Sequence, residues 1–160
     1  MKMKANNTLL LMGCVLVLAA LCFLSVDAPM RFQRQRTERE AVVKQRLLTI
    51  RAAEEKYRVK HGAYAGSFAE LAKGGLLADS LSYIPFSSKK RFSLQASSTV
   101  GKSGRLVPLM ECGAEYADYL NGLDESSVAS LTDEANAAGR YPGLKIGDLE
   151  TPNGNAGNWE

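Results

Sequence analysis

Side chains that could do chemistry are sparse in this chain. It has one histidine, His61, and three cysteines, of which Cys14 and Cys22 lie in an apolar run and Cys112 stands alone further on. No two cysteines are spaced as Cys-x-x-Cys, so neither a zinc site nor a disulfide framework is expected. General acid–base or nucleophilic catalysis needs titratable groups that converge, and no Ser or Asp stands at a recognisable spacing from His61. The sequence therefore predicts a protein that is not an enzyme.

One short segment matches a nucleotide-binding loop. Residues 96–103 read Ala-Ser-Ser-Thr-Val-Gly-Lys-Ser, which fits the loose pattern of Ala or Gly, four residues and then Gly-Lys-Ser. A phosphate-binding loop leads into a helix whose N-terminus faces the phosphates, whereas residues 104–108 are strand-like and contain Pro108. The segment is therefore predicted to be the end of a strand followed by a hairpin turn at residues 100–104.

The C-terminal tail, residues 150–160, is rich in Asn and Gly, and oxygen-bearing side chains gather in and just before it. Asp148, Asn153 and Asn155 are candidate calcium ligands, because carboxylate and amide oxygens in a flexible loop suit this ion. Their spacing is not that of an EF-hand. The other interpretation is a turn-rich tail without a cofactor, pinned by Trp159.

The N-terminal part of the chain is an uncharged apolar run from Leu9 to Val26, preceded by a short basic tail, residues 1–8. At about 1.5 Å per residue, a helix of this length is just long enough to cross the hydrocarbon core of a bilayer. A cleavable signal peptide would need a cleavage site that is only poorly matched here. A lipoprotein signal would become polar after Cys14, but the run stays apolar. The run is therefore predicted to be an uncleaved transmembrane helix.

Two opposing signals bear on the orientation of this span. Residues 31–46 carry six Lys and Arg, against two in the tail before the span, and an excess of positive charge favours the cytoplasmic side. Long domains translocate largely regardless of their charge, and a short basic tail before a first span usually stays inside. The expected location is the inner membrane, with a single pass and the C-terminal domain in the periplasm.

A second helical pattern covers residues 27–61, after the sequence Asp27-Ala28-Pro29, which is expected to interrupt or restart the helix. Apolar residues at spacings of three and four form one face, namely Val43, Leu47, Ile50, Ala53 and Tyr57. A weaker stripe almost opposite includes Ala41, Leu48 and Ala52. This stripe is either a partner-binding surface or scattered alanines beside one exposed leucine. Ion pairs four residues apart, such as Glu54 with Arg58, are expected to support the helix.

Residues 62–149 are expected to form one small α+β domain. Ser67 and Glu70 have the spacing of a capping box, which predicts a short helix beginning at Phe68. Asp124 is the predicted N-cap of a second helix, and alternating apolar residues predict strands. The predicted elements are helices at 68–73 and 125–138, strands at 91–99 and 105–112 paired as a hairpin, a third strand at 115–123 and an edge strand at 144–149.

Charge is distributed unevenly along the chain. Residues 30–60 hold ten Lys and Arg against four Glu, whereas the residues from His61 onward hold eight against twelve Asp and Glu. Anionic head groups of a bilayer are a sufficient explanation for a basic stretch beside a span. Because the aromatic and groove-reading features of nucleic-acid-binding proteins are missing, no nucleic-acid partner is expected.

The order of these parts resembles the type IV pilin-like proteins, which include pilins and the pseudopilins of secretion systems. Residues 52–64 and 68–71 are similar to the helix end of pseudopilins and the loop after it, and residues 154–159 to the calcium-loop ending of major pseudopilins. The prepilin cleavage motif Gly-Phe-x-x-x-x-Glu does not precede the span. The endings 141–147 and 155–160 also resemble a family of bacterial single-span membrane proteins to which no activity is assigned.

Pattern and resemblance together predict an α+β fold in which a transmembrane helix continues into a long amphipathic helix packed on a small antiparallel sheet, as in pilins. The resemblance implies a non-catalytic, membrane-anchored structural or interaction protein of a bacterial envelope assembly. Its expected partners are the lipid bilayer and either envelope membrane proteins or further copies of itself. The alternative is an extracytoplasmic module, anchored to the inner membrane, that binds a ligand or calcium.

Overall fold

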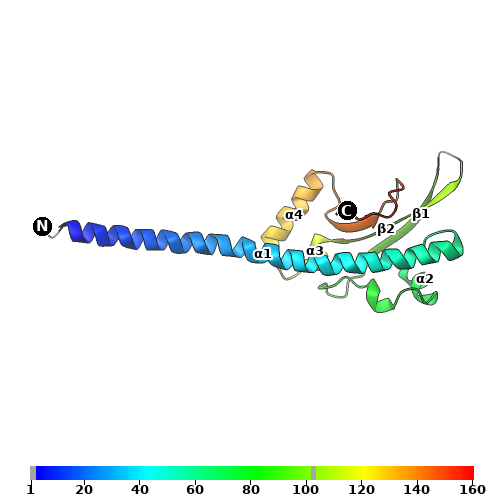
Figure 1. Cartoon of the computed structure of the whole chain (residues 1–160), viewed down its shortest axis with the longest axis horizontal. Helices are drawn as coiled ribbons and strands as arrows, with labels where there is room; N and C mark the ends of the chain where they lie inside the picture. The colour runs from blue at the N-terminus through cyan, green and yellow to red at the C-terminus, as the bar shows by residue number, and fades with distance from the viewer. Residues whose placement is uncertain (1–2, 102–103) are drawn as a thin grey trace. The chain divides into compact units, whose positions relative to one another are not determined.

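The computed structural model describes residues 3–101 and 104–160, apart from the side chains of residues 3–7 and 23–28. The chain divides into two compact units, Met1–Arg36 and Thr37–Glu160. The fold is α+β, with one long helix and a three-stranded antiparallel sheet, which confirms that part of the prediction. The elements are α1 (Met3–His61), α2 (Phe68–Lys73), the 3-10 helix η1 (Asp79–Ser82), β1 (Ser93–Val100), β2 (Leu106–Glu115), α3 (Tyr116–Tyr119), α4 (Glu125–Ala137) and β3 (Gly143–Gly147) (Figure 1).

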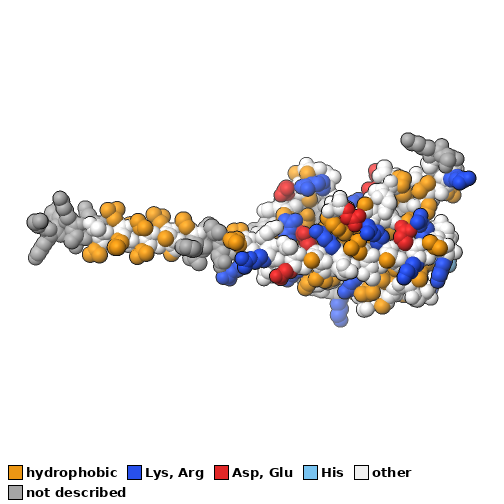
Figure 2. Space-filling view, in the orientation of Figure 1, with side chains coloured by type: hydrophobic (Ala, Val, Ile, Leu, Met, Phe, Trp, Pro, Cys, Tyr) orange, Lys and Arg blue, Asp and Glu red, His pale blue; other side chains and the backbone are white. Residues whose placement is uncertain are grey.

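The first unit consists of the N-terminal part of α1. Its large apolar side chains between Leu9 and Leu21 are between 56% and 69% exposed, and Figure 2 shows them along the visible face of this stretch. A search of the described residues finds no helix that combines the length and the apolar character needed to cross a membrane. Residues 23–26 of the predicted span lie outside the described side chains.

The predicted interruption at Asp27-Ala28-Pro29 is wrong, because α1 runs through Pro29 without a break in its assignment. A proline inside a helix removes one backbone donor and costs about 3 kcal/mol. The residues on either side are mainly good helix formers, Leu and Ala before it and Arg, Gln and Glu after it. Helix formation on both sides of Pro29 is therefore favourable enough to offset the loss of one backbone hydrogen bond.

In the second unit, residues 37–61 of α1 lie along one face of the sheet (Figure 1). Val43, Leu47 and Ile50 have no exposed surface, and Ala53 is also buried, so this part of the predicted apolar face is core. Tyr57, the last member of the predicted face, is only half-buried and donates its hydroxyl to Glu70. Opposite the buried part of the face, the sheet contributes Met110, Cys112 and Ile146, which are equally buried. Periodicity predicted this face correctly because one side of the helix has to be covered by the only sheet that the described chain forms.

The sheet has the order β1-β2-β3, with both neighbouring pairs antiparallel. The predicted hairpin is confirmed by the register that pairs Ser93 with Gly113 and Val100 with Leu106. Strand β3 is the predicted edge strand and pairs with residues 111–115 of β2. Pro108 therefore lies in the part of β2 that has β1 on one side and no strand on the other, where a missing N–H is tolerated.

The predicted third strand at 115–123 is wrong. Strand β2 continues to Glu115, and the chain then forms the short helix α3 and a turn. Tyr119 and Leu120, three and four residues after Tyr116, have no exposed surface. A helical turn places both on one face, whereas a strand would have put one of them on the opposite face.

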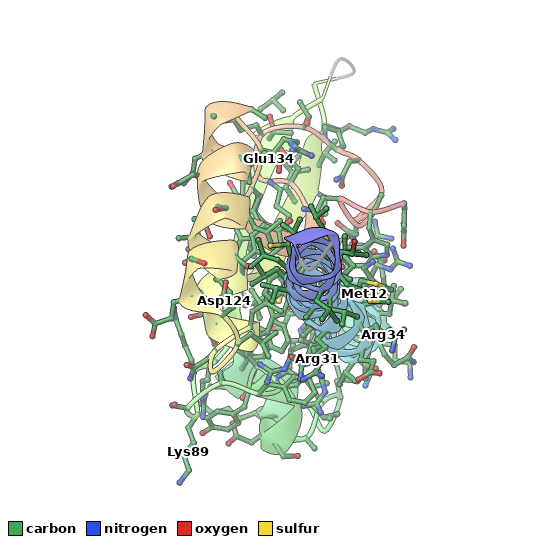
Figure 3. All side chains as sticks on the ribbon, turned by 90° about the vertical axis from the view of Figure 1, so that its left-hand side faces the viewer. Met12, Arg31, Arg34, Lys89, Asp124 and Glu134 are labelled. Atoms are coloured by element: carbon green, nitrogen blue, oxygen red, sulfur yellow. The ribbon has the colours of Figure 1, made fainter. Side chains whose placement is uncertain are left out.

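The N-termini of helices α2 and α4 are capped in different ways. Helix α2 has the predicted bounds, but Ser67 makes no side-chain cap bond. Glu70 accepts a hydrogen bond from the N–H of Gly66 at 3.2 Å and another from the Tyr57 hydroxyl at 3.3 Å, so its carboxylate joins α2 to α1 instead of closing a capping box. At α4, which runs from beside Asp124 past Glu134 (Figure 3), the prediction is confirmed, because Asp124 accepts from the N–H of Ser127 at 2.8 Å.

Candidate interaction site

The predicted partner stripe lies on the surface of α1. Ala41 and Ala52 are exposed and Leu48 is half-buried. Leu48 follows Ala41 by seven residues, about two helical turns, and Ala52 follows Leu48 by four, about one turn. These spacings place all three on one side of the helix. The stripe is therefore an apolar strip at the surface of the second unit, which leaves it accessible to a partner.

Two of the three predicted calcium ligands, Asp148 and Asn153, form local hydrogen bonds that stabilise turns. Asp148 accepts from the N–H groups of Glu150 and Thr151 at 2.8 and 2.9 Å, and these bonds lower the pKa of its carboxyl. Asn153 accepts from the N–H of Asn155 at 3.0 Å. In the described part of the chain, no three His, Cys, Asp or Glu side chains lie close enough to hold a metal ion. Calcium binding stays a prediction.

Among the three predicted calcium ligands, Asn155 makes side-chain hydrogen bonds to the residues that are most distant in the sequence. It is 7% exposed, and its side-chain amide donates to Glu55 Oε1 and to the Tyr64 hydroxyl, both at 2.6 Å. The Tyr64 hydroxyl donates in turn to Glu55 Oε1 at 2.8 Å. Burial, followed by the hydrogen bond to Glu55, raises the pKa of Tyr64. The three side chains tie the tail to α1 and to the loop after it.

Other contacts hold the end of the tail against α1. Arg51 Nη1 donates to the carbonyl of Asn155 at 3.1 Å and pairs with the Glu160 carboxylate at 3.0 Å. The Trp159 ring covers Gly157 so closely that a Cβ there would lie 2.6 Å from ring atoms. The Lys44 ammonium lies 5.7 Å from the centre of a Trp159 ring. The tail is thus a docked part of the second unit.

Glu54 is a buried carboxylate that the sequence interpretation missed. It has no exposed surface, and its Oε2 accepts from the N–H of Ala65 at 2.8 Å. Its Oε1 has no hydrogen-bond partner among the described residues. Burial raises the pKa of Glu54 to about 7, with Glu70 and Glu55 adding to the shift and the Ala65 N–H opposing it.

The helical spacing of the apolar residues already indicated that Glu54 is buried. Glu54 follows Leu47 by seven residues and Ile50 by four, so it belongs to the apolar face. It was interpreted instead as the partner of Arg58. In the structure Arg58 pairs with Glu55 at 2.7 Å.

The Cys112 thiol lies in the core, and the His61 ring packs against a neighbouring aromatic ring. Cys112 has no exposed surface, and burial raises its pKa well above the ordinary value for a thiol. A thiol of this kind is a core side chain with little thiolate character. The His61 ring stacks on Tyr57 with centroids 4.2 Å apart, in the last turn of α1.

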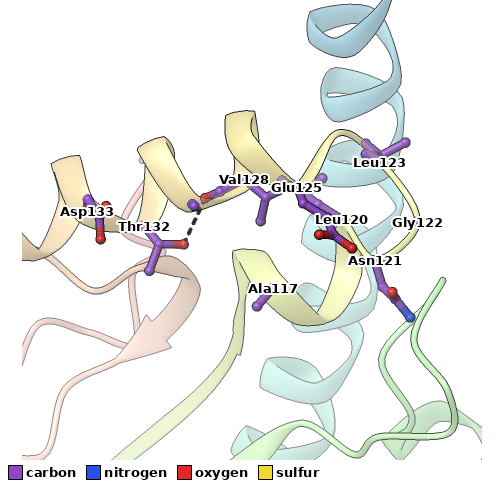
Figure 4. Close-up of a pocket in the computed structure, with 10 residues that line it drawn as sticks. Ala117, Leu120, Asn121, Gly122, Leu123, Glu125, Val128, Thr132 and Asp133 are labelled. Atoms are coloured by element: carbon purple, nitrogen blue, oxygen red, sulfur yellow. Dashed lines mark hydrogen bonds between the residues drawn. The ribbon is translucent and has the colours of Figure 1, made fainter.

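An apolar groove lies between α3 and α4 (Figure 4) and has a volume of about 370 Å³. Ala117, Leu120 and Val128 supply apolar lining, while Glu125 and Asp133 contribute carboxylates. Helix α4 contains no Lys or Arg. The groove therefore offers apolar surface beside negative charge, a combination suited to a basic, amphipathic partner. One of its walls comes from the segment predicted as a strand, which is why no sequence pattern indicated the groove.

Comparison of the chain with protein-family models, with curated proteins and with solved structures finds no match in any of the three.

Proposed function

We propose that this protein is a non-catalytic, membrane-anchored interaction protein of a bacterial envelope assembly, with a pilin-like combination of a long N-terminal helix and a small antiparallel sheet. The observation that supports the proposal is the exposure of the large apolar side chains between Leu9 and Leu21, each more than half exposed. Large exposed apolar surfaces mark sites that are covered in the cell. The hydrocarbon of a bilayer is a suitable cover for an uncharged stretch with no polar face.

The proposed location is the inner membrane, with one pass and the second unit in the periplasm. Arg31 and Arg34 follow the apolar run, where anionic head groups would attract them. Extraction of membranes with alkaline carbonate tests the anchor: the full chain should stay with the membrane pellet. Leu16→Arg/Leu18→Arg should shift it to the supernatant, because each buried charge costs about 2.5–3.5 kcal/mol.

Val59→Arg/Ala72→Arg is the matched control for the anchor, because it adds the same two charges at exposed positions of the second unit that lie outside the stripe. This variant should sediment as the wild type does. Recovery of the wild-type chain in the supernatant would contradict the anchor.

Partner binding is proposed for the stripe formed by Ala41, Leu48 and Ala52. Crosslinking in intact cells followed by mass spectrometry should give stable protein partners, either envelope proteins or copies of this chain. Leu48→Glu should remove them, because it puts a charge into an apolar contact. Thr49→Glu is the control, since Thr49 is exposed and lies next to the stripe. An unchanged partner set in Leu48→Glu, or no partner in the wild type, would overturn this assignment.

A further inference from the structure

The two edge strands of the sheet, β1 and β3, differ in the hydrogen bonding of their outward-facing backbone groups. At the outer edge of β3, the tail supplies backbone partners: the N–H of Gly147 donates to Ala156 and the N–H of Asn158 to Lys145, both at 3.0 Å. An isolated bridge between Ile146 and Gly157 completes this cover. The tail therefore closes one edge of the sheet, and the other edge belongs to β1.

The direction of the backbone groups in β1 follows from its pairing. The N–H of Gly101 donates to the carbonyl of Arg105 at 2.8 Å, and hydrogen-bonded pairs alternate with non-hydrogen-bonded pairs along an antiparallel ladder. In this register the odd-numbered residues of β1 therefore bond to β2, and the even-numbered residues point their N–H and C=O groups outward. The outward bond from the N–H of Phe92 to Ser82, at 2.9 Å, agrees with this assignment.

Leu94, Ala96 and Ser98 are the next outward-facing residues, and no other described segment forms backbone hydrogen bonds with them. Natural proteins usually protect such an edge with lysine, proline, a bulge or a covering segment. Strand β1 has the sequence Ser-Leu-Gln-Ala-Ser-Ser-Thr-Val, which contains no charge and no proline. Its eight residues are paired with β2 in an unbroken register, without a bulge. This edge is thus open for the addition of a strand.

A shallow depression lies beside the middle of this edge. It has a volume of about 530 Å³ and is lined by Ala63, Tyr64, Gly66 and Glu70 on one side and by residues 96–98 on the other. An added strand would run about 4.8 Å from β1, with alternate side chains directed toward this depression. The small lining residues leave room for a long side chain.

The charge of the depression indicates which side chain would fit. Glu70 is held in place by its bonds to Gly66 and Tyr57. Glu70 and Glu55 each lie close enough to the carboxyl group of Glu54 to disfavour a negative charge on it. Arg58 is engaged with Glu55. A lysine or arginine side chain therefore complements the depression better than an acidic one.

We infer that the outer edge of β1 takes up an extended segment of a partner protein as a fourth strand, with a basic side chain of that segment over the depression beside Glu70. The inference rests on the proposed interaction function and names how the partner is held. Main-chain hydrogen bonds provide affinity in this mode of binding, and the side-chain site provides selectivity. Antiparallel pairing with β1 of a second copy would point residues 37–61 of the two copies in opposite directions, which does not suit two copies anchored in one membrane.

The test uses the full chain in detergent micelles and three synthetic peptides. The first is Thr-Val-Thr-Lys-Thr-Val-Thr, the second has Glu in place of Lys, and the third is the Lys peptide with N-methyl groups on all of its peptide nitrogens. Fluorescence anisotropy should show binding of the Lys peptide and about tenfold weaker binding of the Glu peptide. The N-methylated peptide should lose binding, because it cannot donate to the edge of β1.

Two substitutions of Ser98 distinguish the loss of an outward-facing N–H group from a loss of folding. Ser98→Pro removes an outward N–H and leaves the bonds between β1 and β2 in place, so it should abolish peptide binding without lowering the melting temperature. Ser98→Thr keeps the N–H and suits a strand, so it should bind the Lys peptide as the wild type does. The N-methylated peptide tests the same bonds with the protein unaltered, should Ser98→Pro fail to fold.

Several results would overturn the inference. They are equal binding of the Lys and N-methylated peptides, undiminished binding by a folded Ser98→Pro variant, and no binding of the Lys peptide at millimolar concentration. Sedimentation that shows a dimer for the wild type and a monomer for Ser98→Pro would assign the edge to a second copy instead. If the peptides fail while Leu48→Glu still removes partners in cells, the proposed function stands and only the strand addition is wrong.

Discussion

The carboxylate of Glu54, which has no exposed surface, accepts the backbone N–H of Ala65 at 2.8 Å and so ties α1 to the loop that follows it. Only one of its two oxygens is satisfied among the described residues. An ionised carboxylate in such a place is costly unless it is fully hydrogen-bonded. The protonated form is therefore favoured, and proton binding at Glu54 is coupled to folding.

Stability should consequently fall as the pH rises from about 4.5 to about 7, and level off above neutrality. The pKa of Glu54 is about 7 in the folded chain, against 4.5 for an ordinary Glu, so the folded state binds the proton more tightly. The stabilisation is complete below the unfolded pKa and is lost as the pH rises through the folded pKa, with a total of about 3 kcal/mol at most. Urea denaturation of the full chain in detergent at about pH 5 and about pH 8 measures this loss.

Glu54→Gln should flatten this dependence, because the amide does not ionise. Glu150→Gln is the control, since Glu150 is exposed, and it should keep the wild-type dependence. A Glu54→Gln variant with the same loss of stability between the two pH values would show that another group is responsible.

Leu47→Ala should lower the free energy of unfolding by about 2–5 kcal/mol, because it leaves a cavity where the helix meets the sheet. Leu47 has no exposed surface. Val59→Ala is the matched control on the same helix, 82% exposed, and it should change stability by less than about 0.5 kcal/mol. Similar values for the two variants in urea denaturation would mean that this face of α1 is not part of the core.

The orientation in the membrane can be tested with an introduced cysteine. Cys112 is unsuitable as a reporter because its thiol is buried, whereas Asn136 is exposed beside the end of α4. In a background with Cys14→Ala and Cys22→Ala, Asn136→Cys should react with a membrane-impermeant maleimide in intact cells whose outer membrane is permeable. Without this substitution, Cys112 should stay unlabelled until the protein is denatured. Labelling of Asn136→Cys only after the inner membrane is opened would place the domain in the cytoplasm.

Asn155→Gly should destabilise the second unit by about 1–3 kcal/mol, because it leaves Glu55 and Tyr64 without a donor they now use. Glycine accepts the positive φ of 58° at this position, so the loss reports the hydrogen bonds and not backbone strain. Asn136→Gly would confound the comparison by weakening a helix end, so Asn136→Ala is the control and should have little effect on the melting temperature. An Asn155→Gly variant as stable as wild type would mean that the tail contributes little.

The same measurement bears on calcium. A tail without a cofactor predicts the same melting temperature with calcium and with a chelator. A rise with calcium that Asp148→Asn abolishes would favour the alternative, an anchored calcium-binding module.

Features that depend on neighbours along the chain could be predicted from the sequence. The spacing of Val43, Leu47 and Ile50 indicated the buried face of α1, Asp124 indicated the start of α4, and Gly101 and Gly104 indicated the turn of the hairpin. Each is confirmed by burial or by a local hydrogen bond. Helical period, capping and turn formation act over a few residues, so the sequence contains the whole of the physical cause.

Features that depend on distant segments were decided by tertiary structure. Tyr119 and Leu120 become helical because the core takes both side chains on one face, where the sequence alone suggested a strand. Glu54 is buried where the loop at Ala65 meets α1, and Asn155 meets Glu55 across 100 residues of chain. Periodicity places a residue on a face but does not say what covers that face, and burial depends on the covering segment. The open edge of β1 has the same origin, since the tail docks on β3 and no segment of the described chain pairs with the outer backbone groups of β1.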